Sequence, residues 1–322
     1  MRENVHDDGG GTGHGGNTGG DTSPAVSVTA IDLSRSGMLI MNGEESADFL
    51  QRLSTNNFRT FNSGAALQTV LTDEKGRIID VVIAVHRGAS IMLLTSPGRS
   101  EAVKTWLERF IIMEDITIDE ETGQHACVAI TGDDSEIGRL VSSAEPAPHD
   151  TLVTLIPFSY YSIPATLAVS NSTAHIQSLL ASRHISLLMP EMFDDFRIAH
   201  GIPAPGKEIV EKTNPLEAGL RGIVDFSKGC YIGQEVIARL NTYEKVQRLL
   251  CRVRVSSRPP VDASAEVIGE EGGHGYITTL GRNVGDDGSV DALAMIRAAS
   301  AVQGACFTFR DTNIQVVVES IL

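Results

Sequence analysis

Cysteine is scarce in this chain of 322 residues, and its four copies are widely spaced. They are Cys127, Cys230, Cys251 and Cys306, and no two of them form a C-x-x-C pair. This absence argues against a zinc ribbon, a thioredoxin-like motif and a self-contained iron–sulfur site. Four cysteines are also too few for a disulfide framework in a chain of this size, so we expect a reducing compartment.

Long hydrophobic runs and positive charge are scarce as well. No segment approaches the roughly 20 apolar residues needed to span a bilayer, and runs such as Ile78–Val85 have the length of a strand. The 26 Lys and Arg residues face 41 Asp and Glu residues, which gives a formal net charge of −15. A surface this acidic repels phosphate backbones. We therefore expect neither a membrane nor a nucleic acid as a direct partner.

Residues 1–26 are rich in glycine and contain almost no apolar side chains. Such a segment buries too little surface to offset its backbone entropy, so we expect a disordered tail. It lacks the apolar stretch of a secretory signal and is too acidic for a mitochondrial transit peptide. The pattern Gly11-x-Gly13-x-x-Gly16 resembles a dinucleotide fingerprint, but without a preceding strand it reflects composition. These features favour a bacterial cytoplasm.

From residue 27 on, short strand patterns alternate with amphipathic helix patterns, and the hydrophobic content of 42% is typical of globular proteins. The predicted helices include Glu44–Leu53, Ser100–Phe110 and Pro190–His200. A hairpin is expected around the turn Asp73–Gly76. Runs of strands with interspersed helices predict an α+β fold with antiparallel sheets. We expect two α+β subdomains in residues 27–248 and a small C-terminal β-barrel or sandwich in residues 249–322.

The densest chemical signal is the octapeptide Lys228-Gly229-Cys230-Tyr231-Ile232-Gly233-Gln234-Glu235. Helical spacing over Tyr231–Leu240 places Cys230 at or just before a helix N-terminus. There the helix dipole and the cation of Lys228 both favour a thiolate. The pattern predicts a reactive or ligand-contacting thiol; the alternative is a buried cysteine in a glycine-flanked turn. The other three cysteines lie in apolar strand-like runs, where we expect inert core thiols.

This octapeptide resembles the signature of the YgfZ family of folate-binding proteins, which are relatives of the glycine-cleavage T-protein, an aminomethyltransferase. Further segments resemble the family's early helix, its first hairpin and the region before the signature: Phe49–Asn56, Val70–Arg77, Arg197–Pro203 and Pro215–Glu217. The resemblance covers roughly residues 27–322 and leaves out only the tail.

The resemblance implies a ring of three subdomains around a central channel for tetrahydrofolate, with the C-terminal β-barrel as the third subdomain. It also implies a role in the assembly or repair of iron–sulfur enzymes, including those that modify tRNA, through transient contacts with these enzymes or with assembly factors. Cys230 would act as a nucleophile or a transient ligand, with Lys228 as its electrostatic activator. The residues expected to line the folate channel are Tyr231, Gln234, Glu217, Arg197 and Arg239.

Several of these residues have structural alternatives that the sequence leaves open. Arg197 would instead bond loop carbonyls, and Glu217 would instead cap a loop amide. Arg239 would form a salt bridge near the mouth of the channel. The nine histidines show no H-x-H or H-E-x-x-H spacing, so we expect no tightly bound metal.

Two departures separate this chain from the T-protein pattern. That pattern tends to carry a glutamate two residues after the arginine matching Arg197, where it reads the pterin; here the position is Ala199. The paired aspartates of the T-protein hairpin are Asp80 and Val81 in this chain. Both losses weaken a general-base assignment and leave Asp80 as a weak catalytic candidate. Whether the chain is an enzyme stays open.

Three functions therefore compete. The first is a folate-binding factor for iron–sulfur enzymes that acts through Cys230. The second is a tetrahydrofolate-dependent aminomethyl or methyl transferase, which rests on the shared fold and on Asp80. The third is a non-catalytic interaction module with an empty channel.

Overall fold

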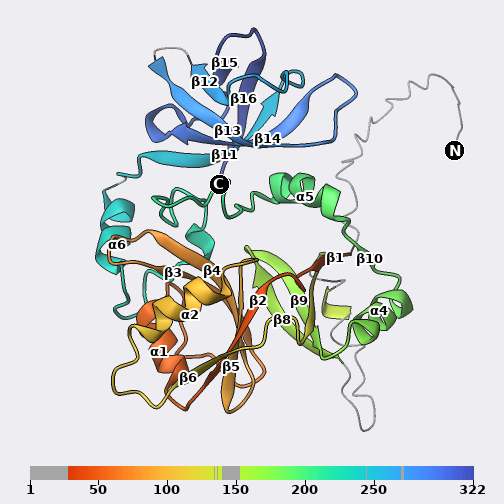
Figure 1. The fold of residues 1–322 in the computed structure, drawn as a ribbon. Coiled ribbons are helices and arrows are strands. Elements are labelled where there is room, and N and C mark those ends of the chain that lie inside the picture. Colours follow the sequence, from red (N-terminus) through yellow and green to blue (C-terminus); the bar gives the residue numbers. More distant parts are fainter. Residues whose placement is uncertain (1–27, 134, 136, 140–152, 244, 270–271) are drawn as a thin grey trace, which may run out of the picture.

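A computed structural model describes residues 28–133, 135, 137–139, 153–243, 245–269 and 272–322. Within these ranges the chain forms two five-stranded sheets and a closed six-stranded barrel. Figure 1 shows the barrel above the two sheets, with irregular chain and short helices between them. The predicted α+β class with a C-terminal β-barrel is confirmed. The predicted tail, residues 1–26, lies outside the described residues.

The first sheet has the strand order β3-β4-β5-β2-β6. Its strands are β2 (Gly37–Asn42), β3 (Ala66–Thr72), β4 (Ile78–His86), β5 (Ser90–Thr95) and β6 (Thr117–Glu120). One face is covered by α1 (Ser46–Leu53) and α2 (Ser100–Glu108), whose apolar side chains join a single core cluster with the sheet. The β3–β4 hairpin turns at Gly76, where φ is +69°, a value that glycine adopts without strain.

The second sheet has the strand order β10-β1-β7-β9-β8 and is antiparallel except for the β1–β10 pair. Its strands are β1 (Thr29–Asp32), β7 (Ala126–Thr131), β8 (Thr154–Tyr160), β9 (Ile163–Ser170) and β10 (Ser186–Leu187). The helix α4 (Thr173–Ser182) packs against the outer face through Ile176 and Leu180.

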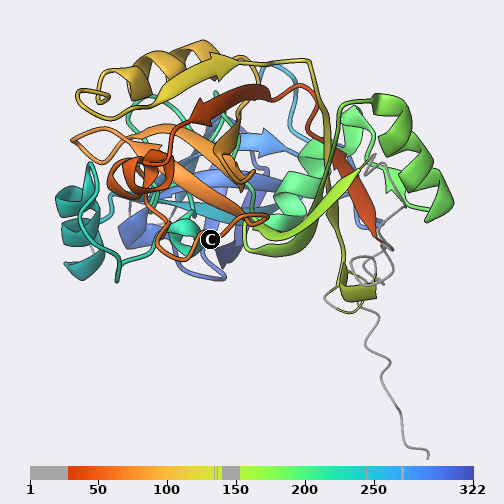
Figure 2. The ribbon, with the colours of Figure 1, turned by 90° about the horizontal axis from the view of Figure 1, so that it is seen from below.

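The two sheets pack against each other through their remaining faces, as Figure 2 shows from below. Side chains alternate between the two faces of a strand. On β4, Ile83 and Val85 therefore join the core between the sheets, whereas Val82 and Ala84 join the core beneath α1 and α2. This alternation decides which side chains of β4 reach the space between the sheets.

The barrel closes in the order β11-β14-β13-β12-β15-β16. Its strands are β11 (Arg248–Val255), β12 (Glu266–Gly269), β13 (His274–Leu280), β14 (Val290–Arg297), β15 (Cys306–Phe309) and β16 (Gln315–Ile321). Valine, alanine and phenylalanine side chains fill its interior. The barrel therefore carries its own core.

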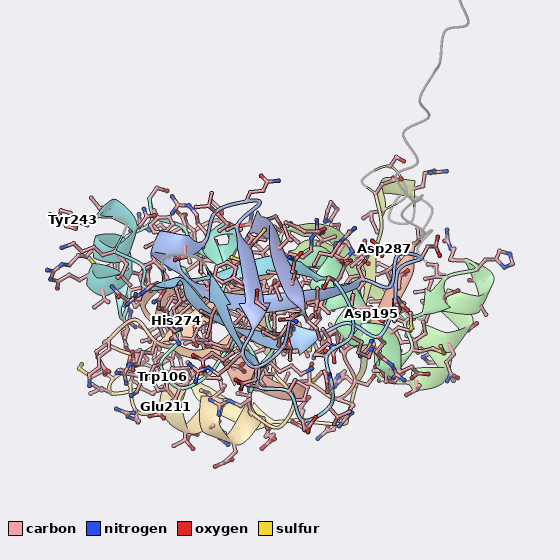
Figure 3. All side chains as sticks on the ribbon, turned by 90° about the horizontal axis from the view of Figure 1, so that it is seen from above. Trp106, Asp195, Glu211, Tyr243, His274 and Asp287 are labelled. Atoms are coloured by element: carbon pink, nitrogen blue, oxygen red, sulfur yellow. The ribbon has the colours of Figure 1, made fainter. Side chains whose placement is uncertain are left out.

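The helix α5 (Phe193–His200) joins the barrel to the sheets. Ile198 packs with Leu250 and Leu293 of the barrel. The Asp195 carboxylate accepts a hydrogen bond of 2.7 Å from the amide of Arg282, at the barrel edge that Figure 3 shows from above. The helix predicted from Pro190 begins as a 3-10 turn and becomes α-helical only at Phe193.

A long connection, residues 201–233, follows α5 and leads to α6 (Gln234–Thr242). In the described ranges, no helix has the length and apolar character needed to cross a membrane.

Candidate functional site

The segment that carries Cys230 is fastened to the β3–β4 hairpin through its backbone. Gly233 has φ +83°, and a Cβ there would lie 2.5 Å from the carbonyl oxygen of Asp73. The Thr72 hydroxyl donates a 2.6 Å hydrogen bond to the Ile232 carbonyl. The Ile232 amide donates to the Arg52 carbonyl of α1 at 3.1 Å. Only glycine fits the close approach at position 233, so the signature fixes this segment against the first sheet.

The prediction of a helix from Tyr231 is wrong, because α6 begins only at Gln234. The left-handed backbone of Gly233 interrupts the helical pattern and forms the N-cap. The N-cap of α6 has no side-chain hydrogen bond. Cys230 is exposed in the preceding loop, outside the first turn where the dipole of the helix acts.

Lys228 lies buried beneath this loop. Its Nζ donates to the carbonyl of Ser54 at 2.7 Å and to the carbonyl of Asn56, and it lies 5.2 Å from the ring centroid of Tyr231. Burial lowers the pKa of Lys228 to about 8, against the attraction of Asp225. The ammonium group thus holds the loop after α1, and its predicted effect on the Cys230 thiol stays a prediction.

Asp225 organises the start of the same loop. Its Oδ1 accepts hydrogen bonds from the Ser227 amide at 2.7 Å and the Lys228 amide at 3.1 Å, and the Ser227 hydroxyl leads the bonds that lower its pKa. An Nη of Arg59 lies 3.5 Å from the position that a Cβ on Gly229 would occupy. A second cation therefore lies against the residue that precedes Cys230.

Tyr231 points into a small core rather than a channel. It is buried with Leu216, Val224 and Ile237, and burial raises the pKa of its phenol to about 12. This packing gives it a structural role beneath the loop.

Glu217, Gln234 and Arg239, which were also predicted to line the channel, have different surroundings. A Glu217 carboxylate oxygen lies 3.8 Å from an Nη of Arg248, and burial raises the pKa of this carboxyl. Gln234 is half-buried and Arg239 is exposed on α6. Among the described residues neither of these two side chains has a hydrogen-bond or ion-pair partner, so the salt bridge expected for Arg239 is absent there.

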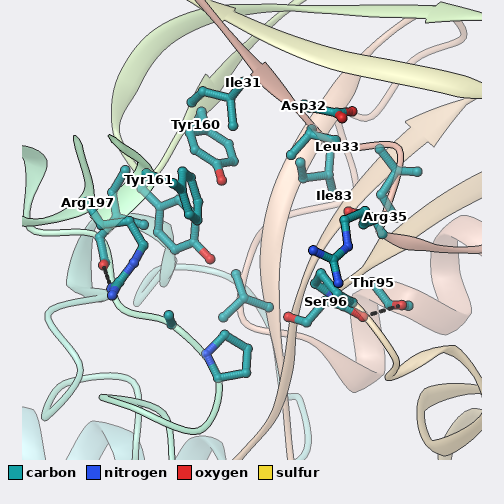
Figure 4. A pocket seen from close by; sticks show the side chains of 18 of the residues that line it. Ile31, Asp32, Leu33, Arg35, Ile83, Thr95, Ser96, Tyr160, Tyr161 and Arg197 are labelled. Carbon is teal, nitrogen blue, oxygen red and sulfur yellow. Dashed lines mark hydrogen bonds between the residues drawn. The ribbon is translucent and has the colours of Figure 1, made fainter. Parts of the chain in front are cut away.

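A cavity of about 400 Å³ lies between the two sheets and beside α5 (Figure 4). Its walls are mainly apolar and aromatic, with side chains from β1, β4, β5, β8 and the chain around α5. Of the predicted channel residues, Arg197 lines it, and so does Val81, one of the two T-protein departures. The loop of Cys230 does not line it, so the predicted site residues fall into two separate places.

Arg197 is buried, and all five of its N–H groups are used by the protein. Nε and Nη2 donate to Asp194 Oδ1 at 3.2 and 2.7 Å, and Nη2 also reaches the Thr279 hydroxyl at 3.0 Å. Nη1 donates to the Ile202 carbonyl at 2.8 Å and to Glu208 Oε2 at 3.0 Å. The side chain therefore ties α5 to the following loop and to the barrel, and it retains no free donor for a ligand.

Asp80 on β4 is buried and is not among the residues that line the cavity, although its neighbour Val81 is. Its Oδ2 accepts a 2.9 Å hydrogen bond from the Ser96 amide. Burial raises the pKa of Asp80, although this hydrogen bond and the nearby Arg99 oppose the shift. The carboxylate thus caps the approach to α2, while Val81 presents an apolar side chain to the cavity.

Tyr160 and Tyr161 form an aromatic wall of the cavity, and neither was predicted from the sequence as a site residue. Their rings are perpendicular with centroids 5.0 Å apart, and both hydroxyls point into the cavity in Figure 4. The Tyr161 amide donates to Gln68 Oε1 at 2.7 Å, which fixes the turn at φ +48°. Two adjacent tyrosines, in a chain that has five tyrosines, were the sequence feature that could have indicated this wall, and the feature is weak.

The remaining cysteines divide by burial. Burial raises the pKa of Cys127 and of Cys251 to about 12, as inert core thiols require. Cys306 is exposed on β15, so its predicted burial is wrong. Within the described ranges, no three His, Cys, Asp or Glu side chains gather as a metal site.

With this geometry in hand, comparison with known proteins gives a family for the first part of the chain. Residues 25–148 match the family described as the GCVT N-terminal domain. This part of the chain therefore resembles a GCVT N-terminal domain. A "tRNA-modifying protein YgfZ" of Colwellia psychrerythraea is 24% identical over 280 residues, covering 83% of this chain and 84% of that protein. The resemblance to YgfZ and the T-protein is thereby confirmed.

Aminomethyltransferases match this chain to a similar degree. That of Thermotoga sp. strain RQ2 is 24% identical over 292 residues, covering 80% of this chain and 77% of that protein. A chloroplast protein of Arabidopsis thaliana named as a transferase is 27% identical over 285 residues. That match covers 80% of this chain but only 63% of the plant protein, so the chain spans less than two thirds of its length.

A solved structure shares the fold of this chain. The glycine cleavage system aminomethyltransferase T from Bartonella henselae superposes with a TM-score of 0.73 at 19% identity. The superposition covers 92% of this chain and 86% of that one. It places both sheets and the barrel within a T-protein-like architecture.

Proposed function

We propose that this protein binds a tetrahydrofolate in the cavity and supports the assembly or repair of iron–sulfur enzymes, including those that modify tRNA, through Cys230. The observation that carries the proposal is the exposed Cys230 in a loop that Gly233, Lys228 and Asp225 hold rigidly against the GCVT domain. Exposure of a free cysteine is uncommon, because free cysteine is among the most buried residue types. The YgfZ relative and the match to the GCVT domain agree with this reading.

The cavity suits a reduced pterin. Its volume lies within the range of about 300–1,000 Å³ that small-molecule sites occupy, and such sites combine apolar walls with a few placed polar groups. Tyr160 and Tyr161 offer aromatic surface and hydroxyl groups to a flat heterocycle. Burial raises the pKa of both phenols, so they stay protonated and able to donate hydrogen bonds at neutral pH.

The same geometry supports a binding role over aminomethyl transfer. General-base catalysis needs a carboxylate within hydrogen-bond reach of the substrate, but Asp80 is not among the residues that line the cavity, whereas Val81 is. Ala199 is exposed at the end of α5, where its carbonyl accepts a 3.2 Å hydrogen bond from Arg252. Both carboxylates of the T-protein pattern are thus missing from the space that a folate would occupy.

The proposed partners are iron–sulfur enzymes or their assembly factors, met transiently in a bacterial cytoplasm. A cluster takes about four ligands, so one thiolate cannot hold it alone. Cys230 would supply one ligand of the cluster, and the partner would supply the others.

The test is complementation in a cell that lacks the gene. Wild type, Cys230→Ser and Cys306→Ser are supplied at equal protein level, and methylthiolation of tRNA by a [4Fe–4S] enzyme is measured. Cys306 is the matched control because it is also a free, exposed cysteine, on the barrel. We expect wild type and Cys306→Ser to restore the modification and Cys230→Ser to fail. Full restoration by Cys230→Ser would contradict the proposal.

A further inference from the structure

Most polar groups around the cavity are already occupied by the protein. Every N–H group of the Arg197 side chain donates a hydrogen bond to a neighbouring residue. The Thr95 hydroxyl donates to the Ser96 carbonyl at 3.2 Å, and the Ser96 amide donates to Asp80. Gln68 Oε1 accepts from the Tyr161 amide. These groups shape the wall but leave little hydrogen-bonding capacity for a ligand.

Three side chains keep polar groups free for a ligand. The hydroxyls of Tyr160 and Tyr161 and the guanidinium of Arg35 have no hydrogen-bond or ion-pair partner among the described residues. The Tyr160 residue is only 6% exposed, and its hydroxyl is directed into the cavity. A hydroxyl that faces a cavity and has no partner in the protein is free to form a hydrogen bond with a ligand there.

Arg35 supplies a cation to the lining of the cavity. It lies in the turn between β1 and β2, it is exposed, and Figure 4 shows its guanidinium turned toward the space that Tyr161 faces. The nearby Asp32 carboxylate accepts a 2.8 Å hydrogen bond from the Ser34 amide and forms no ion pair with Arg35. The positive charge is therefore left to an external anion, on a protein whose net charge is −15.

The cavity thus offers two kinds of polar group. Tyr160 and Tyr161 present neutral hydroxyls between apolar side chains, and the exposed Arg35 presents a guanidinium. Guanidinium groups bind carboxylates through two parallel hydrogen bonds, a geometry that ammonium groups lack. A ligand with a flat neutral ring system at one end and a carboxylate at the other end matches this pattern.

We propose that Arg35 binds the carboxylate end of the ligand and makes the cavity selective for ligands with an anionic tail. Resting on the proposed function, this assigns the contact of Arg35 to the glutamyl carboxylates of tetrahydrofolate, while the pterin ring lies against Tyr160 and Tyr161. Arg35 is a specificity-determining residue in this arrangement and takes no part in chemistry.

The experiment measures binding of two probes by calorimetry: tetrahydrofolate and 6-methyltetrahydropterin, which has the ring but no carboxylate. The variants are Arg35→Ala and Arg35→Lys, with Arg87→Ala as the matched control. Arg87 is another exposed arginine with no ion pair among the described residues, and it does not line the cavity.

We expect Arg35→Ala to weaken tetrahydrofolate binding about 5- to 20-fold, the size of one charge-assisted contact. Binding of 6-methyltetrahydropterin should not change, Arg35→Lys should recover part of the loss, and Arg87→Ala should bind like wild type. High salt should narrow the gap between wild type and Arg35→Ala, because the contact is exposed.

Two results overturn this inference and leave the proposed function standing. One is unchanged tetrahydrofolate binding in Arg35→Ala, and the other is an equal loss for both probes, which would show a general effect on the cavity. Failure of the wild type to bind tetrahydrofolate at all overturns both proposals.

Discussion

Gly233 lies so close to Asp73 that a Cβ at position 233 would come within 2.5 Å of the Asp73 carbonyl oxygen. This contact joins the loop of Cys230 to the tip of the β3–β4 hairpin. Thr72 and Gly76 complete the same contact surface. The position of Cys230 therefore depends on a backbone-to-backbone fit, which no larger residue at position 233 can reproduce.

Gly233→Ala tests this fit against backbone strain alone. Gly304 provides the control, because it has the same φ of +83° but no atom within 4 Å of its would-be Cβ. Alanine in a left-handed conformation costs about 1–2 kcal/mol, which applies to both positions. Urea unfolding should show Gly233→Ala to be less stable than Gly304→Ala by at least about 2 kcal/mol. Equal losses would mean that the hairpin contact contributes nothing.

Lys228→Met tests the role of the buried ammonium. The change leaves the carbonyls of Ser54 and Asn56 without their donor, and an unsatisfied buried acceptor costs about 1–3 kcal/mol. The free energy of unfolding should fall by that amount. Lys75→Met, at an exposed lysine of the hairpin turn, should stay within about 0.5 kcal/mol of wild type. A Lys228→Met protein as stable as wild type would contradict the structural role of Lys228.

Asp80→Asn separates the binding account from the transferase account. The pKa of Asp80 is raised in the folded protein, so the folded state binds a proton more readily than the unfolded state. Wild-type stability should therefore rise relative to Asp80→Asn as pH falls through the folded-state pKa, and the advantage should be complete below the unfolded value. Urea unfolding of both proteins across acidic pH measures this difference.

The same variant should complement the gene deletion as well as wild type does. The asparagine oxygen still accepts a hydrogen bond from the Ser96 amide, and residue 80 is not among those that line the cavity. Loss of complementation by a folded Asp80→Asn protein would favour a catalytic carboxylate instead.

Much of the fold follows from local patterns in the sequence. The β3–β4 hairpin, α1, α2 and the long barrel strands have clear apolar periodicity, and their existence was predicted correctly. The barrel strands β12 and β15 have only four residues each, which is too short for a clear alternating pattern. Cys306 was placed inside although Phe307 and Phe309 point inward, so the two-residue alternation of β15 already turns Cys306 outward.

The candidate site was harder to predict than the fold. The loop of Cys230 is one continuous segment, so its motif was readable, but the start of α6 depends on the contact between Gly233 and the hairpin. The cavity combines Arg35, Val81, Tyr160 and chain near Arg197, which are distant in sequence. Only the packing of two sheets brings these side chains together, and no local pattern marks that packing.

The most direct measurement of the central claim is tetrahydrofolate binding by wild type, Ser36→Trp and Ser34→Trp. Ser36 lines the cavity, whereas Ser34 is an exposed neighbour that does not. At 100 times its Kd, a ligand stabilises the folded state by about 2.7 kcal/mol. We predict that saturating tetrahydrofolate raises the Tm of wild type and of Ser34→Trp but not of Ser36→Trp. An unchanged Tm for wild type, or an equal rise for all three proteins, would contradict the account.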